Sequence, residues 1–230
     1  MKIGIISAIK EEIKNFKNII KKYKKNVIHH CPVYTGQFKN INIVLIQSGV
    51  GKVSASVATM ILINLYHPKY IINVGSAGSL SAILKIGDII IPNLICYHDV
   101  DLTNFGYSLG QIPRFPKMFK NNDTLLNLSY NSAKKLKYCF FKELLISGDS
   151  FIRHKNSIKK LQTKFFPAIA VDMEAAAISQ VCYQFNIPLI VIKYISDASD
   201  QRATVNFKKN VSCASHKTFT LIKNMLCSLF

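Results

Sequence analysis

The sequence predicts one α/β domain built on a largely buried sheet. Short apolar runs typical of buried strands alternate with amphipathic stretches of helical period along all 230 residues. Several of these runs are apolar throughout, as in strands that are covered on both faces of a sheet. No Pro/Gly/Ser-rich linker, repeat or low-complexity tract divides the chain. We therefore expect a single domain over residues 1–230.

The elements of the first half follow in order from these patterns. The apolar run at 2–6 predicts a strand, and apolar residues at helical spacing, with lysines between them, predict a helix over 11–25. Alternating residues on either side of Lys39-Asn40 predict antiparallel strands within 27–47. The remaining expected elements are a helix over 51–66 that ends at His67-Pro68, a strand over 70–74 that runs into the loop 75–78, and a strand over 88–97.

The second half alternates helices and strands more regularly. Periodicity predicts helices over 123–137, 157–165, 173–185 and 207–229, and strands over 141–146, 168–171 and 189–195. Residues 98–119 have no clear period. A loop of that length in a compact domain is usually functional or part of an interface.

Composition excludes several classes of protein. The chain is 49% hydrophobic, which excludes disorder, and no apolar run reaches the roughly 18 residues that span a bilayer. The acidic residues Glu11 and Glu12 follow too short an apolar stretch for a signal peptide, so we expect a cytoplasmic protein without membrane contact. The six cysteines form no CxxC pair, and we expect neither a metal nor another cofactor.

The net charge of +18 leaves a nucleic-acid-binding module as a remote alternative. Only Arg114, Arg153 and Arg202 are arginines, whereas base readers favour arginine. The abundance of Lys, Ile and Asn also matches A/T-rich codons. We therefore expect no specific nucleic-acid partner.

Carboxylates gather where predicted strands end. Asp149, Asp172, Glu174 and Asp197 each follow a strand, and Glu11 and Glu12 follow the first one. Ligands of open α/β sheets bind beyond such strand ends, although each acid taken singly could equally cap a helix. The run GVGK at 49–52 matches neither a P-loop nor a dinucleotide fingerprint.

Motifs in a fixed order then indicate a family. They are KIGIISAIKEEI (2–13), YTG (34–36), SGVGKV (48–53), NVGSAG (73–78), YHDVDLTNFGYSLGQIP (97–113), SGDSFI (147–152), AVDMEAAAI (170–178) and ISDASD (195–200). Together they resemble the bacterial 5′-methylthioadenosine/S-adenosylhomocysteine nucleosidases over essentially the whole chain. The resemblance implies a nucleoside phosphorylase-like fold, with a mixed twisted sheet surrounded by helices, and a homodimer.

The resemblance also implies a reaction, namely hydrolysis of the N-glycosidic bond of methylthioadenosine, adenosylhomocysteine and 5′-deoxyadenosine, in methionine salvage and S-adenosylmethionine recycling. Adenine leaves poorly as an anion, so an acid must protonate it, and Asp197 matches that acid. Glu12 matches the base that activates water on the other face of the sugar. Glu174 matches the acid that grips the ribose hydroxyls.

Other positions match substrate contacts of the family. Phe151 and Ile152 would bind adenine, Ser196 would orient Asp197, Ser76 and Gly78 would line the water side, and Met173 would lie beneath the ribose. The alkylthio group would lie among Ile9, Val50 and Phe207, with Leu102, Phe105 and Pro113 contributed by the partner subunit.

Two departures from the family concern charged residues. Lys193 stands where Arg is usual, and Asp172 stands where Glu is commoner. We expect Lys193 to pair with Glu12 or Glu174 at the water end of the site. The main alternative activity is a phosphate-dependent nucleoside phosphorylase of the same fold. It is disfavoured because Asn73 stands where related phosphorylases place an arginine and because Glu12 would repel phosphate.

Overall fold

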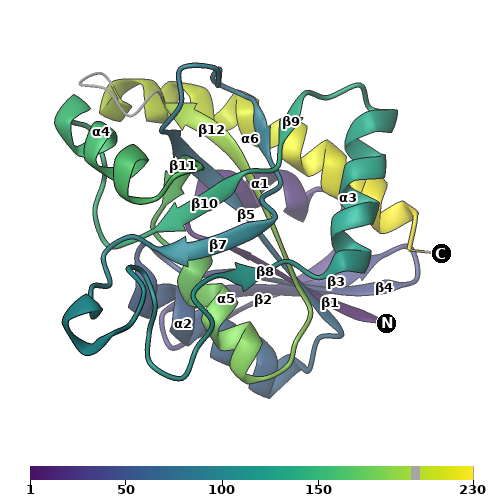
Figure 1. Cartoon of the computed structure of the whole chain (residues 1–230). Helices are drawn as coiled ribbons and strands as arrows, with labels where there is room; N and C mark the ends of the chain where they lie inside the picture. The colour runs from purple at the N-terminus through teal and green to yellow at the C-terminus, as the bar shows by residue number, and fades with distance from the viewer. Residues whose placement is uncertain (198–202, 230) are drawn as a thin grey trace.

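A computed structural model describes residues 1–197 and 203–229, with side chains of α6 described from residue 215 onward. Its described residues form a mixed sheet of twelve strands surrounded by helices (Figure 1). The strands are β1 (Lys2–Ser7), β2 (Lys21–Ile28), β3 (Cys31–Phe38), β4 (Ile41–Gln47), β5 (Tyr70–Ser79), β6 (Ile89–Ile90), β7 (Leu94–Tyr97), β8 (Phe119–Lys120), β9 (Phe140–Phe141), β10 (Leu144–Ser147), β11 (Ala168–Asp172) and β12 (Leu189–Asp197).

The helices lie on both faces of this sheet. They are α1 (Lys10–Lys17), α2 (Lys52–Ile61) with the π-helical turn η1 (Leu62–Tyr66), the 3₁₀ turn η2 (Thr103–Phe105), α3 (Asp123–Lys135), α4 (Lys155–Lys164), α5 (Ala175–Gln184) and α6 (Ala203–Cys227). The α/β fold class and its mixed sheet are therefore confirmed. Within the described residues, no helix is long and apolar enough to cross a membrane.

Strand β5 is the branch point of the sheet. The main path runs β2-β3-β4-β1-β5-β11-β10-β7-β8, and β12 leaves it by pairing with β5 and carrying β6 and β9. β5 pairs in parallel with β1 and β12 and antiparallel with β11. Four strand ends consequently meet around the second half of β5.

Alternation along the strands divides the core into two layers. In β4, Val44 and Ile46 pack in the layer that contains α2 and α5, whereas Ile43 and Leu45 pack in the layer that contains α1, α3 and α6. This is the period of two that a strand buried on both faces requires. A third, smaller cluster packs α4 against the ends of β10 and β11.

The expected helix over 11–25 is wrong beyond residue 17. α1 ends at Lys17, and 21–28 forms β2, an edge strand antiparallel to β3. Ile13, Phe16 and Ile20 are buried as the helical spacing predicts, but Tyr23 is 45% exposed. The lysine-rich stretch has no strong local preference, so pairing with β3 decides its conformation. Its lysines protect an open sheet edge instead of covering a helix.

Other boundaries differ in smaller ways. The expected strand 88–97 divides into β6 and β7 around Pro92, and 141–146 divides into β9 and β10. Residues 75–78 are not a loop, because β5 continues through them to Ser79. There they pair with β12 on one side and with β11 on the other. The long loop after β7 is confirmed, with η2 as its only helical turn and β8 at its end.

Phe16 packs helix α1 against helix α6. Its ring is 1% exposed and meets Phe219 of α6 edge-on, with 5.4 Å between ring centroids. We predict that Phe16→Ala lowers the free energy of unfolding by about 3–5 kcal/mol, the usual cost of deleting a buried aromatic ring. Urea denaturation measures the loss, and Tyr23→Ala on the exposed strand β2 is the control, with an expected change below about 1 kcal/mol.

Candidate active site

A cavity of about 240 Å³ opens where the ends of β1, β5, β11 and β12 meet. Loops that follow β4 and β10 complete its wall. Its lining residues are Ala8, Ile9, Glu12, Val50, Asn73, Gly75, Ser76, Ala77, Gly78, Ser150, Phe151, Ile152, Val171, Asp172, Met173, Glu174, Lys193, Ser196 and Asp197. The wall is apolar except for a few converging carboxylates, hydroxyls and one ammonium, which is the usual make-up of a small-molecule site.

Glu12 is held in one orientation by hydrogen-bond donors from three elements. Its Oε1 accepts bonds from the Ser76 backbone N–H at 2.9 Å and the Ser76 hydroxyl at 3.0 Å, and the Tyr194 hydroxyl lies 3.4 Å away. Its Oε2 accepts from the Ser7 hydroxyl at 2.5 Å. The side chain is 2% exposed. These donors stabilise a buried carboxylate whose position is fixed.

Gly75 makes room for this carboxylate. A Cβ at position 75 would lie 3.2 Å from Glu12 Oε2, closer than a methyl group tolerates without displacement. The glycine lets strand β5 pass directly beneath the Glu12 carboxylate. The glycine at position 75 of the NVGSAG motif thus makes room for a carboxylate.

Asp197 ends β12 beside an irregularity of the strand. The β12–β5 register shifts between Ile195 and Asp197, and such a shift redirects the side chains that follow. The Ser196 hydroxyl donates to Asp197 Oδ2 at 2.8 Å, and both residues are buried. Ser196 therefore orients the carboxyl group, as the resemblance implies.

Glu174 connects the cavity to the start of α2. Its Oε1 accepts a bond of 2.9 Å from the N–H of Gly51, which precedes that helix and has φ +94°. Burial raises the pKa of Glu174 to about 7, with a further contribution from the Asp172 charge, against the opposing Lys193 charge and Gly51 bond. Glu174 therefore titrates near neutrality.

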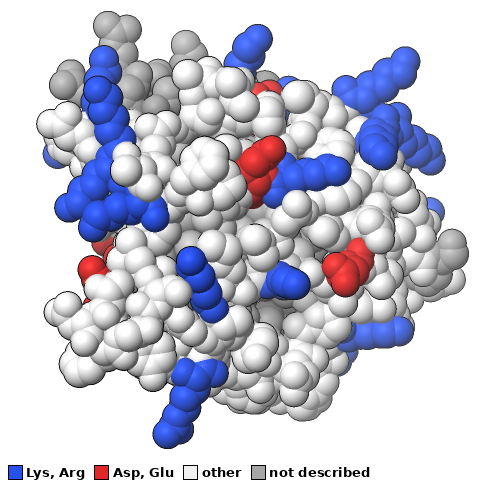
Figure 2. All heavy atoms as spheres, viewed as in Figure 1, with Lys and Arg blue, Asp and Glu red and all other residues white. Residues whose placement is uncertain are grey.

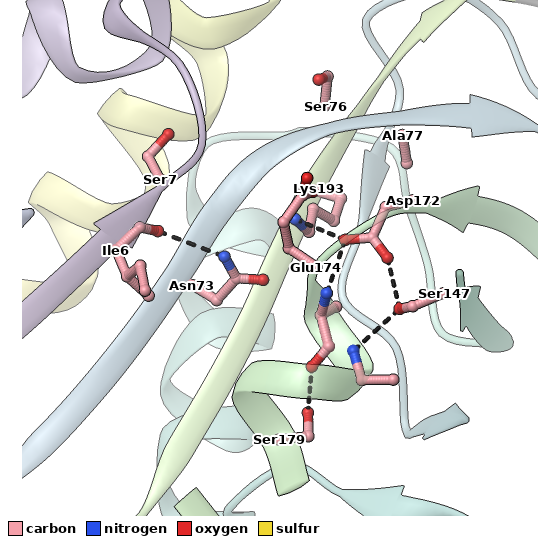
Figure 3. A network of polar contacts seen from close by, with 12 residues as sticks. Ile6, Ser7, Asn73, Ser76, Ala77, Ser147, Asp172, Glu174, Ser179 and Lys193 are labelled. Atoms are coloured by element: carbon pink, nitrogen blue, oxygen red, sulfur yellow. Dashed lines mark hydrogen bonds and ion pairs between the residues drawn. The ribbon is translucent and has the colours of Figure 1, made fainter. Parts of the chain in front are cut away.

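Lys193 pairs with Asp172 and not with Glu12 or Glu174 (Figure 3). Its ammonium lies 2.8 Å from Asp172 Oδ2, and both side chains are at most 2% exposed. Asp172 Oδ1 also accepts from the Ser147 hydroxyl at 2.5 Å, and its Oδ2 accepts from the Ala175 N–H at 3.0 Å. The expected partner of Lys193 is thus wrong. The two departures from the family pattern form one ion pair.

The charge of Lys193 persists in this buried place. Burial alone would lower the pKa of the ammonium, but the nearby Asp172 and Glu174 carboxylates outweigh it and hold the pKa above its usual value. Lys193 thus supplies one positive charge to a cavity that also contains Glu12, Asp172, Glu174 and Asp197.

An ion-pair network anchors the loop that carries Phe151 and Ile152. Asp149 Oδ1 accepts from the Lys52 N–H at 2.8 Å, and Asp99 Oδ2 accepts from the Asp149 N–H at 2.9 Å. The Lys52 ammonium lies 2.6 Å from the same Asp99 oxygen. The loop is therefore attached to the start of α2 and to the segment after β7.

Known proteins resemble this chain along nearly its whole length. A sequence model of the phosphorylase superfamily matches residues 2–226. The 5′-methylthioadenosine/S-adenosylhomocysteine nucleosidase of Buchnera aphidicola subsp. Acyrthosiphon pisum (strain Tuc7) is 55% identical over 229 residues, which cover 100% of this chain and 99% of the relative. The chain belongs to the 5′-methylthioadenosine/S-adenosylhomocysteine nucleosidase family.

Solved structures agree with this membership. The nucleosidase of Neisseria meningitidis, in complex with methylthio-immucillin-A, superimposes with a TM-score of 0.96 at 32% identity over 99% of each chain. Futalosine hydrolase of Helicobacter pylori strain 26695 also superimposes, with a TM-score of 0.95 at 28% identity over 99% of this chain and 98% of that one. The nucleoside phosphorylase-like fold is therefore confirmed.

The cavity brings together most of the site residues expected from the family motifs. Those that line it are Ile9, Glu12, Val50, Ser76, Gly78, Phe151, Ile152, Met173, Glu174, Lys193, Ser196 and Asp197. Leu102, Phe105 and Pro113 do not line it and lie on the long loop after β7. Phe207 falls in the part of α6 whose side chains lie outside the described residues.

Sequence reasoning missed three polar contributors to the site. Asn73 lines the cavity, whereas the sequence indicates only that no arginine stands at this position. The backbone N–H of Gly51 donates to Glu174, a contact that the sequence of the 49–52 turn does not indicate. Tyr194 reaches Glu12 from β12. The sequence motifs contain Asn73 and Gly51 but not Tyr194, and only the strand pairing shows what these residues face. No group of three or more potential metal-ligating residues occurs in the described part of the chain.

The Asp172–Lys193 pair yields a stability prediction. We expect Asp172→Asn to lower the free energy of unfolding by about 3–5 kcal/mol, because it leaves the buried ammonium without its counter-ion. The double variant Asp172→Asn/Lys193→Met removes both charges and should recover most of that loss. Urea denaturation of the four proteins of this cycle measures both effects. A cost for Asp172→Asn that the double variant leaves unchanged would contradict the pairing.

Proposed function

We propose that this protein hydrolyses the N-glycosidic bond of 5′-methylthioadenosine and S-adenosylhomocysteine. It releases adenine and the 5-substituted ribose. The observation that carries the proposal is that two buried carboxylates, Glu12 of helix α1 and Asp197 at the end of strand β12, line one cavity in a chain of this nucleosidase family. A paired acid and base is what cleavage of a glycosidic bond by water requires.

The roles follow from the positions of these groups. Asp197, oriented by Ser196, gives its proton to adenine N7 as the C1′–N9 bond breaks. Glu12 takes one proton from the water whose oxygen forms the new bond to C1′. Glu174 accepts hydrogen bonds from the ribose hydroxyls, and these bonds strengthen as the sugar becomes cationic. The other proton of the water stays on the oxygen, which becomes the 1-hydroxyl of the sugar.

The remaining lining residues divide between the two ends of the substrate. Phe151 and Ile152 contact adenine, Ser76 and Gly78 line the water side, and Met173 lies beneath the ribose. The 5′-substituent lies among Ile9, Val50 and Phe207, and 5′-deoxyadenosine fits the same arrangement.

We propose further that the protein is cytoplasmic and forms a homodimer. In it the partner subunit provides Leu102, Phe105 and Pro113 to the site. The exposure of Phe105, at 77%, supports this arrangement, because a large aromatic ring on a long loop favours burial against another surface. Sedimentation at micromolar concentration tests the dimer, and a fully active monomer would contradict it.

A phosphorylase activity is disfavoured by the charges of the cavity. Its described lining contains no arginine, and its one ammonium, Lys193, is already paired with Asp172. The fixed Glu12 carboxylate would repel a phosphate dianion. A nucleic-acid partner is disfavoured by the surface, where Lys and Arg are spread over the visible face with acidic residues among them (Figure 2).

The first test measures adenine release from methylthioadenosine with and without phosphate. We expect equal rates and a free reducing sugar as the second product, because the cavity has no arginine cradle for phosphate. A phosphate requirement with formation of a sugar 1-phosphate would establish the phosphorylase instead.

The second test removes the acid and the base separately. We expect Asp197→Asn to lower kcat by about 10²–10⁴, the usual loss with a general acid, and Glu12→Gln to lower it comparably. Glu12→Gln should still bind substrate, because it removes the base and leaves the ribose contacts. Steady-state kinetics and calorimetric binding measure the two effects. Near-normal kcat in the Asp197 variant would exclude Asp197 as the acid.

The third test uses the titration of Glu174. Its pKa of about 7 means that the carboxylate becomes protonated as the pH falls through neutrality. Ribose binding should then weaken, and kcat/KM should fall about tenfold per unit on the acid side. Lys193→Met removes a charge that lowers this pKa, so the acid limb should move to higher pH, whereas the exposed control Lys39→Met should leave it in place. An unmoved limb in Lys193→Met would contradict the assignment.

A further inference from the structure

Asn73 carries a buried acceptor that has no partner. The residue is 1% exposed and lines the cavity, and its Oδ1 makes no hydrogen bond to any described residue. Two other described side chains hold such an atom, His98 Nε2 and Asn224 Oδ1, but neither lines the cavity. A buried acceptor without a donor is costly, and in a native protein it indicates a bound water or ligand.

The orientation of the Asn73 amide is determined by its other end. Its Nδ2 donates to the Ile6 carbonyl of β1 at 3.3 Å, and only an N–H can donate there. Oδ1 must therefore point the opposite way. Figure 3 shows that it points toward the side chains of Lys193 and Glu174.

Lys193 offers the matching donors. In the parallel pair of β5 and β12, Val191 is opposite Asn73 and Lys193 is opposite Gly75, so Asn73 and Lys193 lie on neighbouring strands, two positions apart in register. The ammonium has three N–H groups, and Asp172 is its one ion-pair partner among the described residues. Gly75, next along this face of β5, adjoins the Glu12 carboxylate. An acceptor, a donor and a base therefore line the same cavity, on or beside neighbouring positions of β5 and β12.

We propose that Asn73 binds the water molecule that attacks C1′, and this inference rests on the hydrolysis proposed above. Four directions around the water oxygen are then accounted for. One O–H donates to Glu12, the second O–H donates to Asn73 Oδ1, one lone pair accepts from Lys193, and the other lone pair faces C1′.

The second O–H is the part of the reaction that Asn73 controls. As the oxygen bonds to C1′, Glu12 takes the first proton, and the second hydrogen stays on the oxygen. A neutral carbonyl accepts that hydrogen without removing it, so it aligns the nucleophile without competing with the base. It also selects a nucleophile that has two hydrogens.

Methanol tests this selection because it has only one O–H. Bound with that hydrogen on Glu12, methanol would leave Asn73 Oδ1 unpaired and place its methyl group where the amide lies. The wild-type protein should therefore convert methylthioadenosine in water–methanol mixtures almost entirely to the free sugar. In Asn73→Ala the methyl group gains space, and the amide Oδ1 that methanol would leave unpaired is absent. The ratio of methyl riboside to free sugar should rise about tenfold or more.

Kinetic constants and a conservative variant separate this role from a structural one. Asn73→Ala should lower kcat about 10- to 100-fold and leave KM within about threefold, because the water and not the substrate loses its contact. Asn73→Thr keeps a neutral oxygen acceptor in a side chain of similar size and should keep most of the wild-type preference for water. Ser179→Ala is the control, because it deletes a buried hydroxyl of α5 that does not line the cavity.

The outcomes are distinct. If the wild-type protein releases adenine but Asn73→Ala keeps the wild-type product ratio, the inference is wrong and the proposed hydrolysis stands. If the wild-type protein releases no adenine, the proposed function itself fails. Should Asn73→Ala not fold, a crystal structure of the wild type with a substrate analogue decides. An ordered water within about 3.2 Å of both Asn73 Oδ1 and Glu12 supports the inference, and a water bound to Glu12 alone overturns it.

Discussion

The buried ion pair between Asp172 and Lys193 is the interaction on which the site depends. Four carboxylates and one ammonium share a cavity of about 240 Å³. Burial and the neighbouring Asp172 charge raise the pKa of Glu174 to about 7. The Lys193 charge opposes that increase, and the ammonium keeps its own charge because Asp172 lies 2.8 Å away and Glu174 is also near. Removing Lys193 would therefore raise the pKa of Glu174 further.

The branched sheet explains why these groups can converge. β5 pairs with β1, β11 and β12, so residues distant in the sequence share its second half. β1 leads into Glu12, β11 ends at Asp172 just before Glu174, and β12 carries Lys193 and Asp197. Glycine at position 75 allows the close approach of Glu12 to β5. Each functional group therefore sits on a strand end or on the first residues after it, which is a rigid support for a reaction that needs fixed geometry.

Most strands and the position of the cavity could be predicted from the sequence, because both follow from local patterns of residues. Apolar runs identify most strands, and acids placed directly after them identify the end of the sheet where the cavity lies. The conformation of the lysine stretch 21–25 could not be predicted, because it depends on pairing with β3 and not on the residues of the stretch itself. The partner of Lys193 could not be predicted either. Its strand is evident in the sequence, but the choice between Asp172, Glu174 and Glu12 depends on ångström-scale differences among three buried carboxylates.

Strand β2 affects whether molecules of this protein associate through their sheet edges at high concentration. A chain that is 49% hydrophobic and whose sheet ends in an edge strand, paired on one side only, offers a template on which further strands can add. Nearly all of β2 is exposed, and Lys21, Lys22, Lys24 and Lys25 occupy four of its eight positions. Two such edges brought together would place rows of positive charge side by side. The basic strand thus acts as a barrier to fibrous aggregation, which gives part of the excess positive charge a purpose unrelated to any ligand.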